Sequence, residues 1–304
     1  MSGIVTVTVK PSLDVTLRVG AMTPNRKLRY DDALIDPGGG GINVARALTV
    51  LGEPATAIWT RGPGFGDDVE RRLDAEGLDH RPVPVEGQTT LSVTVIDDAG
   101  DHLRLSGHGA PPTEDEVEAV TEAIRELAPD WLVLSGGLPP EAPDDLHRRF
   151  AAVGRGLGAK VVVDTHGPPL DAVLGADVFL AKPNRRELAE FTGRSADELD
   201  VEDAAAAIRE ERGLEVLVVS LGADGAVAAT PHGVERVPAP DVEAVSRVGA
   251  GDSMVAGLVA GLQDGDIGEA LRLGVAAGSA ALRTPGTQLC RAEDVEELLG
   301  RIPG

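Results

Sequence analysis

The chain has 304 residues, of which 42% are hydrophobic and 2% aromatic, and its formal net charge is −22. This charge disfavours DNA and RNA as partners, because nucleic-acid backbones carry the same sign, and the single cysteine, Cys290, excludes a disulfide framework and a multi-cysteine metal site. No apolar run approaches the roughly 20 residues of a membrane span, and residues 1–10 lack the pattern of a secretory signal, so we expect a cytoplasmic protein without membrane partners.

Short apolar strands alternate with amphipathic helices along most of the chain. The predicted strands are at residues 4–9, 15–19, 55–59, 91–96, 102–105, 131–134, 160–163, 178–180, 216–220, 226–229 and 234–237. The predicted helices are at residues 42–51, 67–76, 113–127, 142–153, 185–192, 201–212, 251–262, 267–283 and 292–299. Thr113 begins its helix with the pattern of a capping box, because Glu116 follows three residues later.

This alternation predicts an α/β protein with a mainly parallel central sheet that is covered by helices on both faces. The strands at 15–19, 91–96 and 102–105 have no helices between them, which indicates a small antiparallel sheet serving as a lid. No linker rich in Gly, Ser or Pro divides the chain. We therefore expect a single domain over residues 1–304, with lid elements at about 13–35 and 88–108.

The basic residues are nearly all arginine, and the chain has only four lysines: Lys10, Lys27, Lys160 and Lys182. A surface rich in acidic residues and poor in lysine suggests a halophilic protein, since a high-salt cytoplasm screens the repulsion between like charges. GC-biased coding combined with an ordinary acidic surface is the alternative.

Asp252 closes the segment with the strongest chemical signal. Gly249, Ala250 and Gly251 precede it at the start of a predicted helix, where their backbone N–H groups and the helix N-terminus favour an anion. Such a site suits the charge of a phosphoryl group in transfer, and a carboxylate there can accept the proton of an attacking hydroxyl. The alternative is a glycine turn followed by an ordinary aspartate in a first helical turn.

Four consecutive glycines, residues 38–41, precede another predicted helix and permit a ligand to approach closely. Asn43 offers a donor and an acceptor to sugar hydroxyls. One rival is a dinucleotide-binding fingerprint, in which Arg61 would favour a 2′-phosphate. Against it, Val44 takes the place of the third glycine, and Asp36 and Pro37 stand where a buried strand should end. A purely structural loop is the other alternative.

Lys182 follows the strand at 178–180 and can reach a phosphate. Asn184 and Glu187 are three residues apart, so they can share one helix face near a metal-bound phosphate. A helix cap followed by solvated basic residues is the alternative.

Ser220 ends a strand, and Gly222 and Gly225 follow it. Such a segment makes a backbone-lined platform at the carboxyl edge of a sheet, where open α/β folds commonly bind ligands. The alternative is a tight entry into the hairpin that comes next.

Asp14 follows the first strand, where its carboxylate could bind two sugar hydroxyls. Lys27 and Arg29 alternate on one face of an extended segment, and two cations spaced in this way suit a phosphate on the substrate. An exposed charged edge strand is the alternative.

These five segments, in this order, resemble the ribokinase-like (PfkB) sugar-kinase superfamily, and most closely its minor-type ATP-dependent 6-phosphofructokinases. The further matching segments are residues 11–14, 27–29, 37–47, 135–140, 182–184, 218–222, 248–254, 274–280 and 286–290. The resemblance implies a ribokinase-like α/β fold with a β-lid through which such enzymes often dimerise. It also implies transfer of the γ-phosphoryl group of ATP, with Mg²⁺, to a sugar hydroxyl.

The resemblance assigns a role to each candidate residue. The catalytic base is Asp252, and the anion hole is Gly249, Ala250 and Gly251. The positions matched to sugar or sugar phosphate are Asp14, Lys27, Arg29, Gly39, Gly40, Asn43 and Gly137. The positions matched to the nucleotide are Lys182, Asn184, Ser220, Gly222 and Gly225, while Glu187 matches the magnesium region and is expected to act through water.

One feature at the sugar-phosphate end of the site distinguishes sub-families, and two departures from the 6-phosphofructokinase pattern oppose it. Relatives that resemble 1-phosphofructokinases and tagatose-6-phosphate kinases usually carry a lysine where this chain has Gly40, which favours the 6-phosphofructokinase type. The position of a lid arginine that binds phosphate is occupied by Gln88 or a neighbouring threonine, and Gly137 replaces a usual serine. The residues that could compensate for the lost phosphate contact are His102, Arg104 and His108.

The resulting hypothesis is conversion of fructose 6-phosphate and MgATP into fructose 1,6-bisphosphate and ADP. The enzymatic alternatives are a 1-phosphofructokinase, a tagatose-6-phosphate kinase and a kinase for an unphosphorylated sugar. A catalytically silent sugar or nucleotide sensor is the non-enzymatic alternative, against which the intact Asp252 and its glycines argue.

Overall fold

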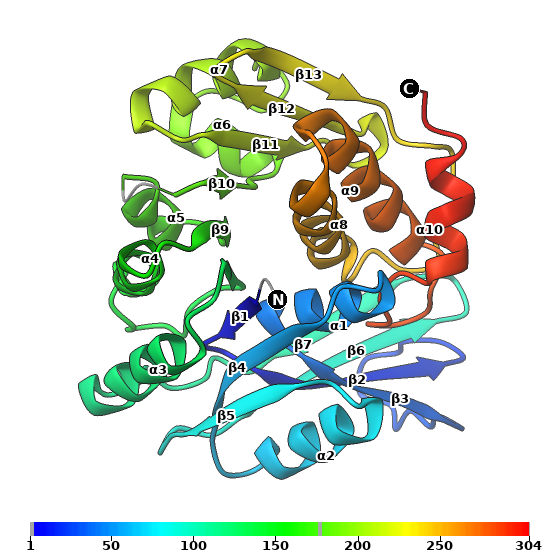
Figure 1. The fold of residues 1–304 in the computed structure, drawn as a ribbon. Helices are drawn as coiled ribbons and strands as arrows, with labels where there is room; N and C mark the ends of the chain where they lie inside the picture. Colours follow the sequence, from blue (N-terminus) through cyan, green and yellow to red (C-terminus); the bar gives the residue numbers. More distant parts are fainter. Residues whose placement is uncertain (1–2, 176–177, 304) are drawn as a thin grey trace.

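The computed structural model describes residues 3–175 and 178–303, which form two sheets and the helices around the larger one (Figure 1). The larger sheet contains, in spatial order, β13 (Gly233–Val237), β12 (Ala226–Thr230), β11 (Val216–Ser220), β10 (Leu180–Ala181), β9 (Lys160–Asp164), β8 (Trp131–Ser135), β1 (Ile4–Thr8), β4 (Ala55–Arg61) and β5 (His80–Pro84). Neighbouring strands are parallel from β11 to β5, and β12 and β13 extend the sheet as antiparallel strands.

Helices cover both faces of this sheet, as predicted. One apolar cluster includes side chains of α1 (Gly40–Val50), α2 (Gly66–Glu76), α8 (Ala250–Asp264), α9 (Ile267–Ala281) and α10 (Ala292–Leu299). The other includes side chains of α3 (Glu114–Leu127), α4 (Leu146–Gly156), α5 (Pro168–Val173), α6 (Arg185–Thr192) and α7 (Val201–Arg212). The central strands read as continuous apolar runs because they are buried on both sides: Val133 packs in the first cluster, and Leu132 and Leu134 pack in the second.

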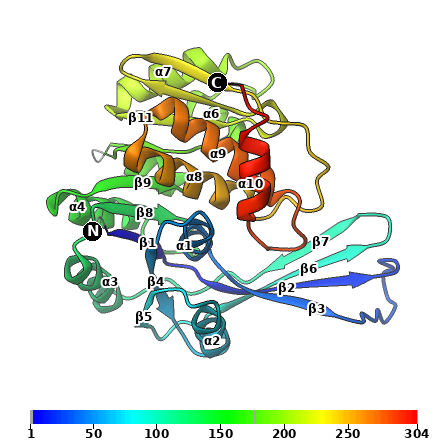
Figure 2. The same ribbon diagram turned by 45° about the vertical axis from the view of Figure 1, so that its right-hand side comes forward.

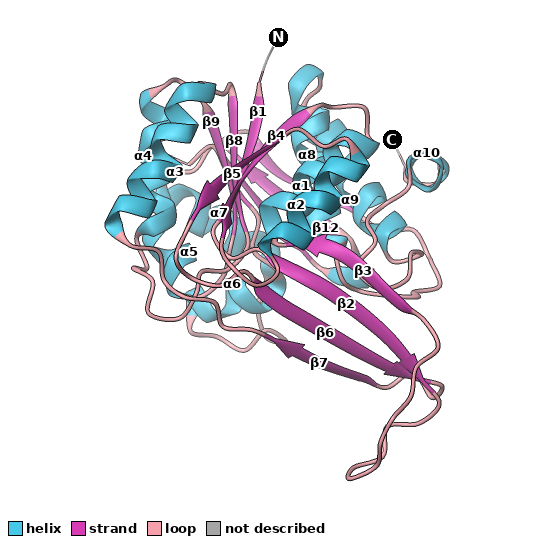
Figure 3. Cartoon of the chain, turned by 90° about the horizontal axis from the view of Figure 1, so that it is seen from below, coloured by secondary structure: helices cyan, strands magenta, loops and turns pink. Residues whose placement is uncertain are grey.

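The smaller sheet is the lid. Its strands, in spatial order, are β3 (Ala33–Gly38), β2 (Ser12–Val19), β6 (Thr90–Asp97) and β7 (His102–Ser106). Figures 2 and 3 show it projecting from the body of the molecule. The outer pairs, β3–β2 and β6–β7, are antiparallel, the second of them as predicted, whereas the central pair, β2–β6, is parallel.

Several elements differ from the prediction, and proline accounts for most of the differences. The unpredicted strands β3 and β5 contain prolines but lie at sheet edges, where a missing N–H donor is tolerated. The short helix α5 begins with two prolines, which suit a first helical turn. Helix α4 begins at Leu146 rather than at residue 142, because Pro143 lies in a turn that precedes it. Within the described residues, no helix is long and apolar enough to cross a bilayer.

Candidate active site

A cleft of about 390 Å³ lies where the carboxyl ends of β1, β8 and β9 approach the lid and the first turns of α1 and α8. The predicted site residues that line it are Asp14, Gly39, Gly40, Asn43, Gly137, Glu187, Gly249 and Asp252. The predicted site residues that do not line it are Lys27, Arg29, Lys182, Asn184, Ser220, Gly222, Gly225, Ala250 and Gly251. The structure therefore brings the first of these two groups to one cleft and leaves the second group outside the lining of that cleft.

The glycine-rich start of α1 packs directly on β1 and β8. In β1, valine and threonine alternate, and the threonines face α1: Thr6 Oγ1 donates to the Gly41 carbonyl at 2.7 Å, and Thr8 Oγ1 accepts from the Ile42 N–H at 2.8 Å. A Cβ atom on Gly40 would lie 2.5 Å from the Gly136 nitrogen, so a side chain there requires the backbone to shift. This close packing places Asn43 at the cleft.

Asp252 lies in the first turn of α8, which begins after Gly249 in a left-handed conformation with φ of 80°. Asn43 Nδ2 donates to Asp252 Oδ2 at 2.9 Å, which joins the starts of α1 and α8 across the cleft. Burial, followed by the nearby carboxylate of Asp164, raises the pKa of Asp252 to about 6. A carboxylate in this range is ionised at neutral pH and is a stronger base than an ordinary aspartate.

Lys182 is only 5% exposed, and its Nζ lies 3.0 Å from Asp164 Oδ1. Burial alone would lower the pKa of the ammonium group, but Asp164 more than offsets this and the pKa of Lys182 is raised on balance. A Cβ atom on Gly251 would lie 3.8 Å from the Lys182 Nζ. The lysine therefore brings a fixed positive charge to the glycine turn before Asp252, although it does not line the cleft itself.

Asn184 and Glu187 form a capping box at the start of α6. The Glu187 N–H donates to Asn184 Oδ1 at 3.0 Å, and the Asn184 N–H donates to Glu187 Oε2 at 2.9 Å. The helix-cap alternative is thus realised for this pair, while Glu187 also lines the cleft. The two functions are compatible, because a capping carboxylate retains acceptor capacity.

The segment after β11 lies beside α6, since Ser220 forms a parallel bridge with Asn184. Gly225 has a φ of 89°, and a Cβ atom there would lie 1.9 Å from the Val237 carbonyl oxygen. The hairpin of β12 and β13 therefore requires glycine at residue 225 for packing. Gly225 therefore serves the tight entry into this hairpin, which was the structural alternative to a nucleotide platform.

At the lid end of the cleft, Asp14 is buried and accepts a 2.6 Å hydrogen bond from Ser12 Oγ. Burial is the main cause that raises its pKa. Lys27 and Arg29 are exposed in the segment between β2 and β3 and lie outside the cleft lining. Of the three proposed replacements for a lid arginine, Arg104 lines the cleft, whereas His102 and His108 are absent from its described lining.

The sequence analysis did not predict some of the residues that line the cleft. Two of them follow the end of a strand, where polar residues in α/β folds often line a ligand site. Asp164 and His166 come directly after the apolar run of β9. A Cβ atom on Gly137 would lie 2.9 Å from His166 Cε1, so the imidazole occupies the space that a serine would need.

His147 is buried next to this segment. Its Nε2 atom lies 3.1 Å from the Gly136 carbonyl oxygen, and burial lowers the pKa of His147 to about 4, which keeps the ring neutral. Other unpredicted lining residues are Lys10 and Arg247.

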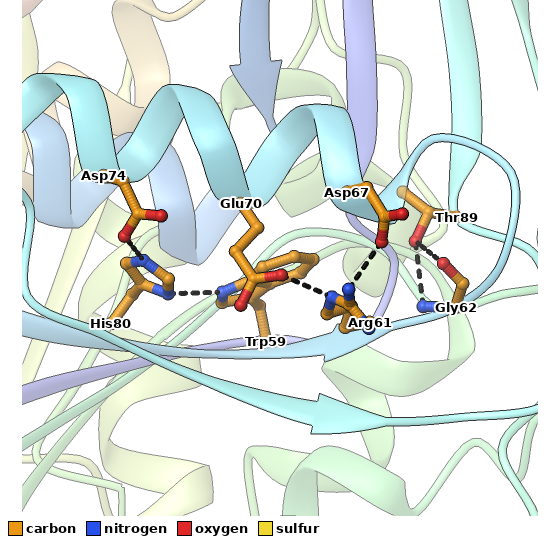
Figure 4. Close-up of polar contacts among 8 residues, drawn as sticks. All are labelled: Trp59, Arg61, Gly62, Asp67, Glu70, Asp74, His80 and Thr89. Atoms are coloured by element: carbon orange, nitrogen blue, oxygen red, sulfur yellow. Dashed lines mark hydrogen bonds and ion pairs between the residues drawn. The ribbon is translucent and has the colours of Figure 1, made fainter.

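Arg61 decides against the dinucleotide-binding alternative. Figure 4 shows its guanidinium group turned toward α2. There Nε donates to Glu70 Oε2 at 2.6 Å, and Nη2 donates to Asp67 Oδ1. Nearby, His80 bridges Asp74 and Trp59 and fixes the same helix to β4 and β5. Arg61 thus secures α2 to the sheet and lies outside the cleft lining.

Several known proteins are similar to this chain over most of its length. The profile of the pfkB family carbohydrate kinase matches residues 13–294. The chain is 39% identical over 298 residues to ATP-dependent 6-phosphofructokinase isozyme 2 of Mycobacterium tuberculosis, with 96% of this chain and 88% of that protein covered. It is 38% identical over 298 residues to a 1-phosphofructokinase of Haloferax volcanii, with 96% and 95% covered.

Solved structures extend the agreement to the fold. The crystal structure of phosphofructokinase-2 from Escherichia coli in complex with potassium has a TM-score of 0.94, with 35% identity and 99% of both chains covered. A ribokinase of Thermotoga maritima, at 22% identity, shares the fold with a TM-score of 0.80, with 99% of this chain and 100% of that chain covered. The predicted resemblance and the ribokinase-like α/β fold are confirmed. With a family match over most of its length and close relatives on both lines of comparison, the chain belongs to the pfkB family of carbohydrate kinases.

Proposed function

We propose that the protein transfers the γ-phosphoryl group of ATP to fructose 6-phosphate and forms fructose 1,6-bisphosphate and ADP. The observation that carries this proposal is Asp252, a buried base whose pKa burial and Asp164 raise, beside a glycine turn at a helix N-terminus. The 6-phosphofructokinases among the relatives support fructose 6-phosphate as the sugar substrate. We further propose a single kinase domain over residues 1–304 that acts in the cytoplasm.

Each residue then has a physical task. Asp252 accepts the proton of the attacking C1 hydroxyl, which Asn43 and Asp14 orient from the opposite side of the cleft. The N–H groups of Gly249, Ala250 and Gly251 stabilise the negative charge that develops on the transferred group. Lys182 adds a positive charge, while Ser220 and Gly222, with Gly225 behind them, support the nucleotide.

Magnesium enters this proposal as part of MgATP, and it supplies charge neutralisation at the phosphates. Among the described residues, no group of three or more His, Cys, Asp or Glu side chains could hold a metal ion. Asp164 is paired with Lys182, and Glu187 is engaged in its capping box. The residues therefore fit an ion that is held mainly by phosphate oxygens and water, with Glu187 acting through water.

A turnover screen tests the proposal. ADP release would be measured with fructose 6-phosphate, fructose 1-phosphate, tagatose 6-phosphate and fructose, at low and at multimolar KCl. We expect the highest kcat/KM with fructose 6-phosphate, and higher activity in KCl if the acidic surface reflects a halophilic protein. Preference for fructose 1-phosphate would instead favour the function named for the Haloferax volcanii relative. ATP binding without turnover on any sugar would favour a sensor.

Exposed apolar side chains on the lid favour a homodimer that forms through this sheet. Large apolar side chains exposed on it are Leu28, Tyr30, Leu34, Leu103 and Leu105. Burying them between two lids would remove apolar surface from water. A solved structure of a relative, Escherichia coli phosphofructokinase-2, is described as a tetrameric inhibited form.

Replacing both Lys27 and Arg29 with methionine tests the proposed phosphate contacts of this lid. Because these cations lie outside the cleft of their own chain, they can reach a substrate only when the lid closes or pairs. We expect the KM for fructose 6-phosphate to rise about tenfold or more, with the KM for ATP unchanged. An equal KM in the double variant, measured where light scattering shows an intact dimer, would remove these residues from the site.

The pKa of Asp252 predicts the acid limb of activity. Since a protonated carboxyl cannot accept a proton, kcat/KM should fall as the pH drops through about 6. The hydrogen bond from Asn43 opposes the upward shift in the pKa that burial causes, so Asn43→Leu should move the midpoint to higher pH. The measurement is kcat/KM against pH for both proteins. An acid limb that stays in place in the variant would contradict the assignment of Asp252 as the titrating base.

A further inference from the structure

The loop between α9 and α10 contacts the lid. A Cβ atom on Gly286 would lie 3.0 Å from Thr16 Oγ1 of β2 and 3.4 Å from Leu34 Cδ1 of β3, so the loop packs directly on two lid strands. Next to it, Thr287 Oγ1 donates to Asp36 Oδ2 of β3 at 3.0 Å, although the two residues are 251 positions apart. This hydrogen bond is a direct polar connection between the lid and the body of the molecule.

The far end of the same loop packs against the turn that begins α8. A Cβ atom on Gly249 would lie 2.9 Å from Leu289 Cδ2. The Cys290 N–H donates to the buried Ser253 Oγ at 3.4 Å, one residue after Asp252. The loop therefore touches the lid at one end and the turn beside the proposed base at the other.

Buried hydroxyl groups hold this loop in one shape. Thr284 Oγ1 donates to the Gln288 carbonyl at 2.8 Å. Ser246 Oγ donates to the Gly286 carbonyl at 2.6 Å and accepts from the Val248 N–H at 3.2 Å, which ties the loop to the segment before α8. Because breaking such buried bonds is costly, the loop can keep its two ends at a fixed separation.

Asp36 stands directly opposite Asp14 in the register of β2 and β3, so the two side chains share one face of the lid. Burial is the main cause that raises the pKa of Asp14, and the charge of Asp36 adds to it. Arg46 of α1 holds the same strand: it donates to the Pro37 carbonyl at 3.2 Å, and its Nη2 lies 3.8 Å from Asp36 Oδ1. Asp36 and Thr287 are absent from the described lining of the cleft, so they act through Asp14 and not on a ligand.

We propose that Asp36 and Thr287 are positioning residues that set the separation of Asp14 and Asp252, and with it the rate of phosphoryl transfer. This rests on the proposed function, in which Asp14 orients the sugar and Asp252 accepts the proton of its hydroxyl. The two carboxylates are carried by different parts of the fold, β2 in the lid and α8 in the body. Since a misplacement of about 1 Å can lower a rate roughly 10²-fold, a bond that fixes one part against the other controls turnover.

The first test measures turnover. Thr287→Val removes the hydroxyl group at nearly constant volume, and Thr287→Ser retains it. We expect Thr287→Val to lower kcat with fructose 6-phosphate about tenfold or more, with the Kd for ATP within about twofold, and Thr287→Ser to keep most of the activity. The matched control is Thr60→Val in β4, because Thr60 is also buried and donates to the Val9 carbonyl at 2.8 Å but is absent from the described lining of the cleft. It should leave kcat unchanged.

A double-variant cycle tests the pairing of the two residues. Asp36→Leu removes the acceptor of the bond, so it should also lower kcat about tenfold or more. Adding Thr287→Val to Asp36→Leu should lower kcat no further, because the bond is already lost. Losses that multiply in the double variant would show that the two side chains act separately, which overturns the pairing.

Distances between spin labels test the positioning without relying on activity. The native Cys290 is buried, so labels can be attached through Ala99→Cys, in the exposed turn between β6 and β7, and Ala119→Cys, on the exposed side of α3. The labelled protein is diluted with unlabelled chain, so that only distances within one chain are observed. We expect Thr287→Val to broaden the distribution of distances between lid and body, and Thr287→Ser and Thr60→Val to leave it unchanged.

The two measurements separate the failure of this inference from the failure of the proposed function. If the wild-type protein phosphorylates the sugar and Thr287→Val has an unchanged kcat, the inference fails while the kinase proposal stands, whatever the label distances show. If the wild-type protein phosphorylates no sugar, the kinase proposal fails and the label distances decide the inference. An unchanged distribution in Thr287→Val would then overturn it, and a broader one would support the positioning of the lid.

Discussion

Asp252→Asn is expected to lower kcat by about 10²- to 10⁴-fold, the range typical of losing a positioned general base. The amide oxygen of the new side chain can still accept the hydrogen bond from Asn43, so the cleft should keep its shape. The change removes only the ability to take a proton from the sugar hydroxyl. The measurement is ADP release at saturating sugar and ATP, with calorimetry to verify that ATP still binds.

Asp115→Asn is the matched control for this substitution, because Asp115 also lies in the first turn of a helix, α3, but is exposed and lies outside the described lining of the cleft. It should leave kcat unchanged. Turnover of Asp252→Asn within about tenfold of wild type would show that another group accepts the proton.

The same substitution should stabilise the protein at neutral pH. A carboxyl whose pKa is raised to about 6 in the folded state binds protons more tightly when folded, so its contribution to stability is greatest below the unfolded value and is lost as pH rises through about 6. Removing the charge should increase the free energy of unfolding at pH 7 by on the order of 1–3 kcal/mol. Urea unfolding of Asp252→Asn and of wild type at pH 7 measures this difference in the free energy of unfolding. A variant less stable than wild type would show that the buried charge of Asp252 does not destabilise the fold.

Lys182→Met has the largest expected effect on stability. Lys182 and Asp164 form a pair that is 5% and 17% exposed, and removing the lysine leaves the carboxylate partly buried without its partner. Breaking such a pair typically costs about 3–5 kcal/mol. Asp252 would also lose a nearby positive charge. We therefore expect a lower urea midpoint at pH 7 and reduced turnover in the same variant.

The double variant Lys182→Met, Asp164→Leu distinguishes pairing from packing. If the loss in Lys182→Met comes from the unpaired carboxylate, removing that carboxylate as well should recover much of the unfolding free energy. Additive losses in the double variant would show that the lysine stem, and not the ion pair, provides the stability.

Local sequence patterns predicted the parts of the site that depend on consecutive residues. The turn at Gly249 and the helix that carries Asp252 are both set by neighbouring residues, and the capping pattern of Asn184 and Glu187 is likewise contained within one turn. The alternation of Thr6 and Thr8 with valines in β1 marked a strand, but its purpose, binding the backbone of α1, depends on a contact with residues more than 30 positions away.

The missed residues are those whose meaning arises only from tertiary packing. Lys10 was not predicted as a site residue, because nothing in its local segment indicates that it shares a cleft with Arg104, a candidate phosphate contact 94 positions away. The case of Lys27 and Arg29 is different: their alternation suggested a phosphate contact, and the segment between β2 and β3 places them outside the cleft lining of their own chain. The role assigned to these two cations stays a prediction.

The lid is a separate sheet, and this separation has a consequence for how such a protein can change over evolutionary time. The groups that we propose to handle the phosphoryl transfer belong to the body, around the start of α8, whereas Arg104 and Asp14, which line the lid end of the cleft, belong to lid strands. Substitutions in β6 or β7 can therefore alter which sugar is accepted without disturbing the core on which Asp252 is mounted. Selection on substrate choice and selection on chemistry then act on different sheets, so one can diverge while the other is preserved.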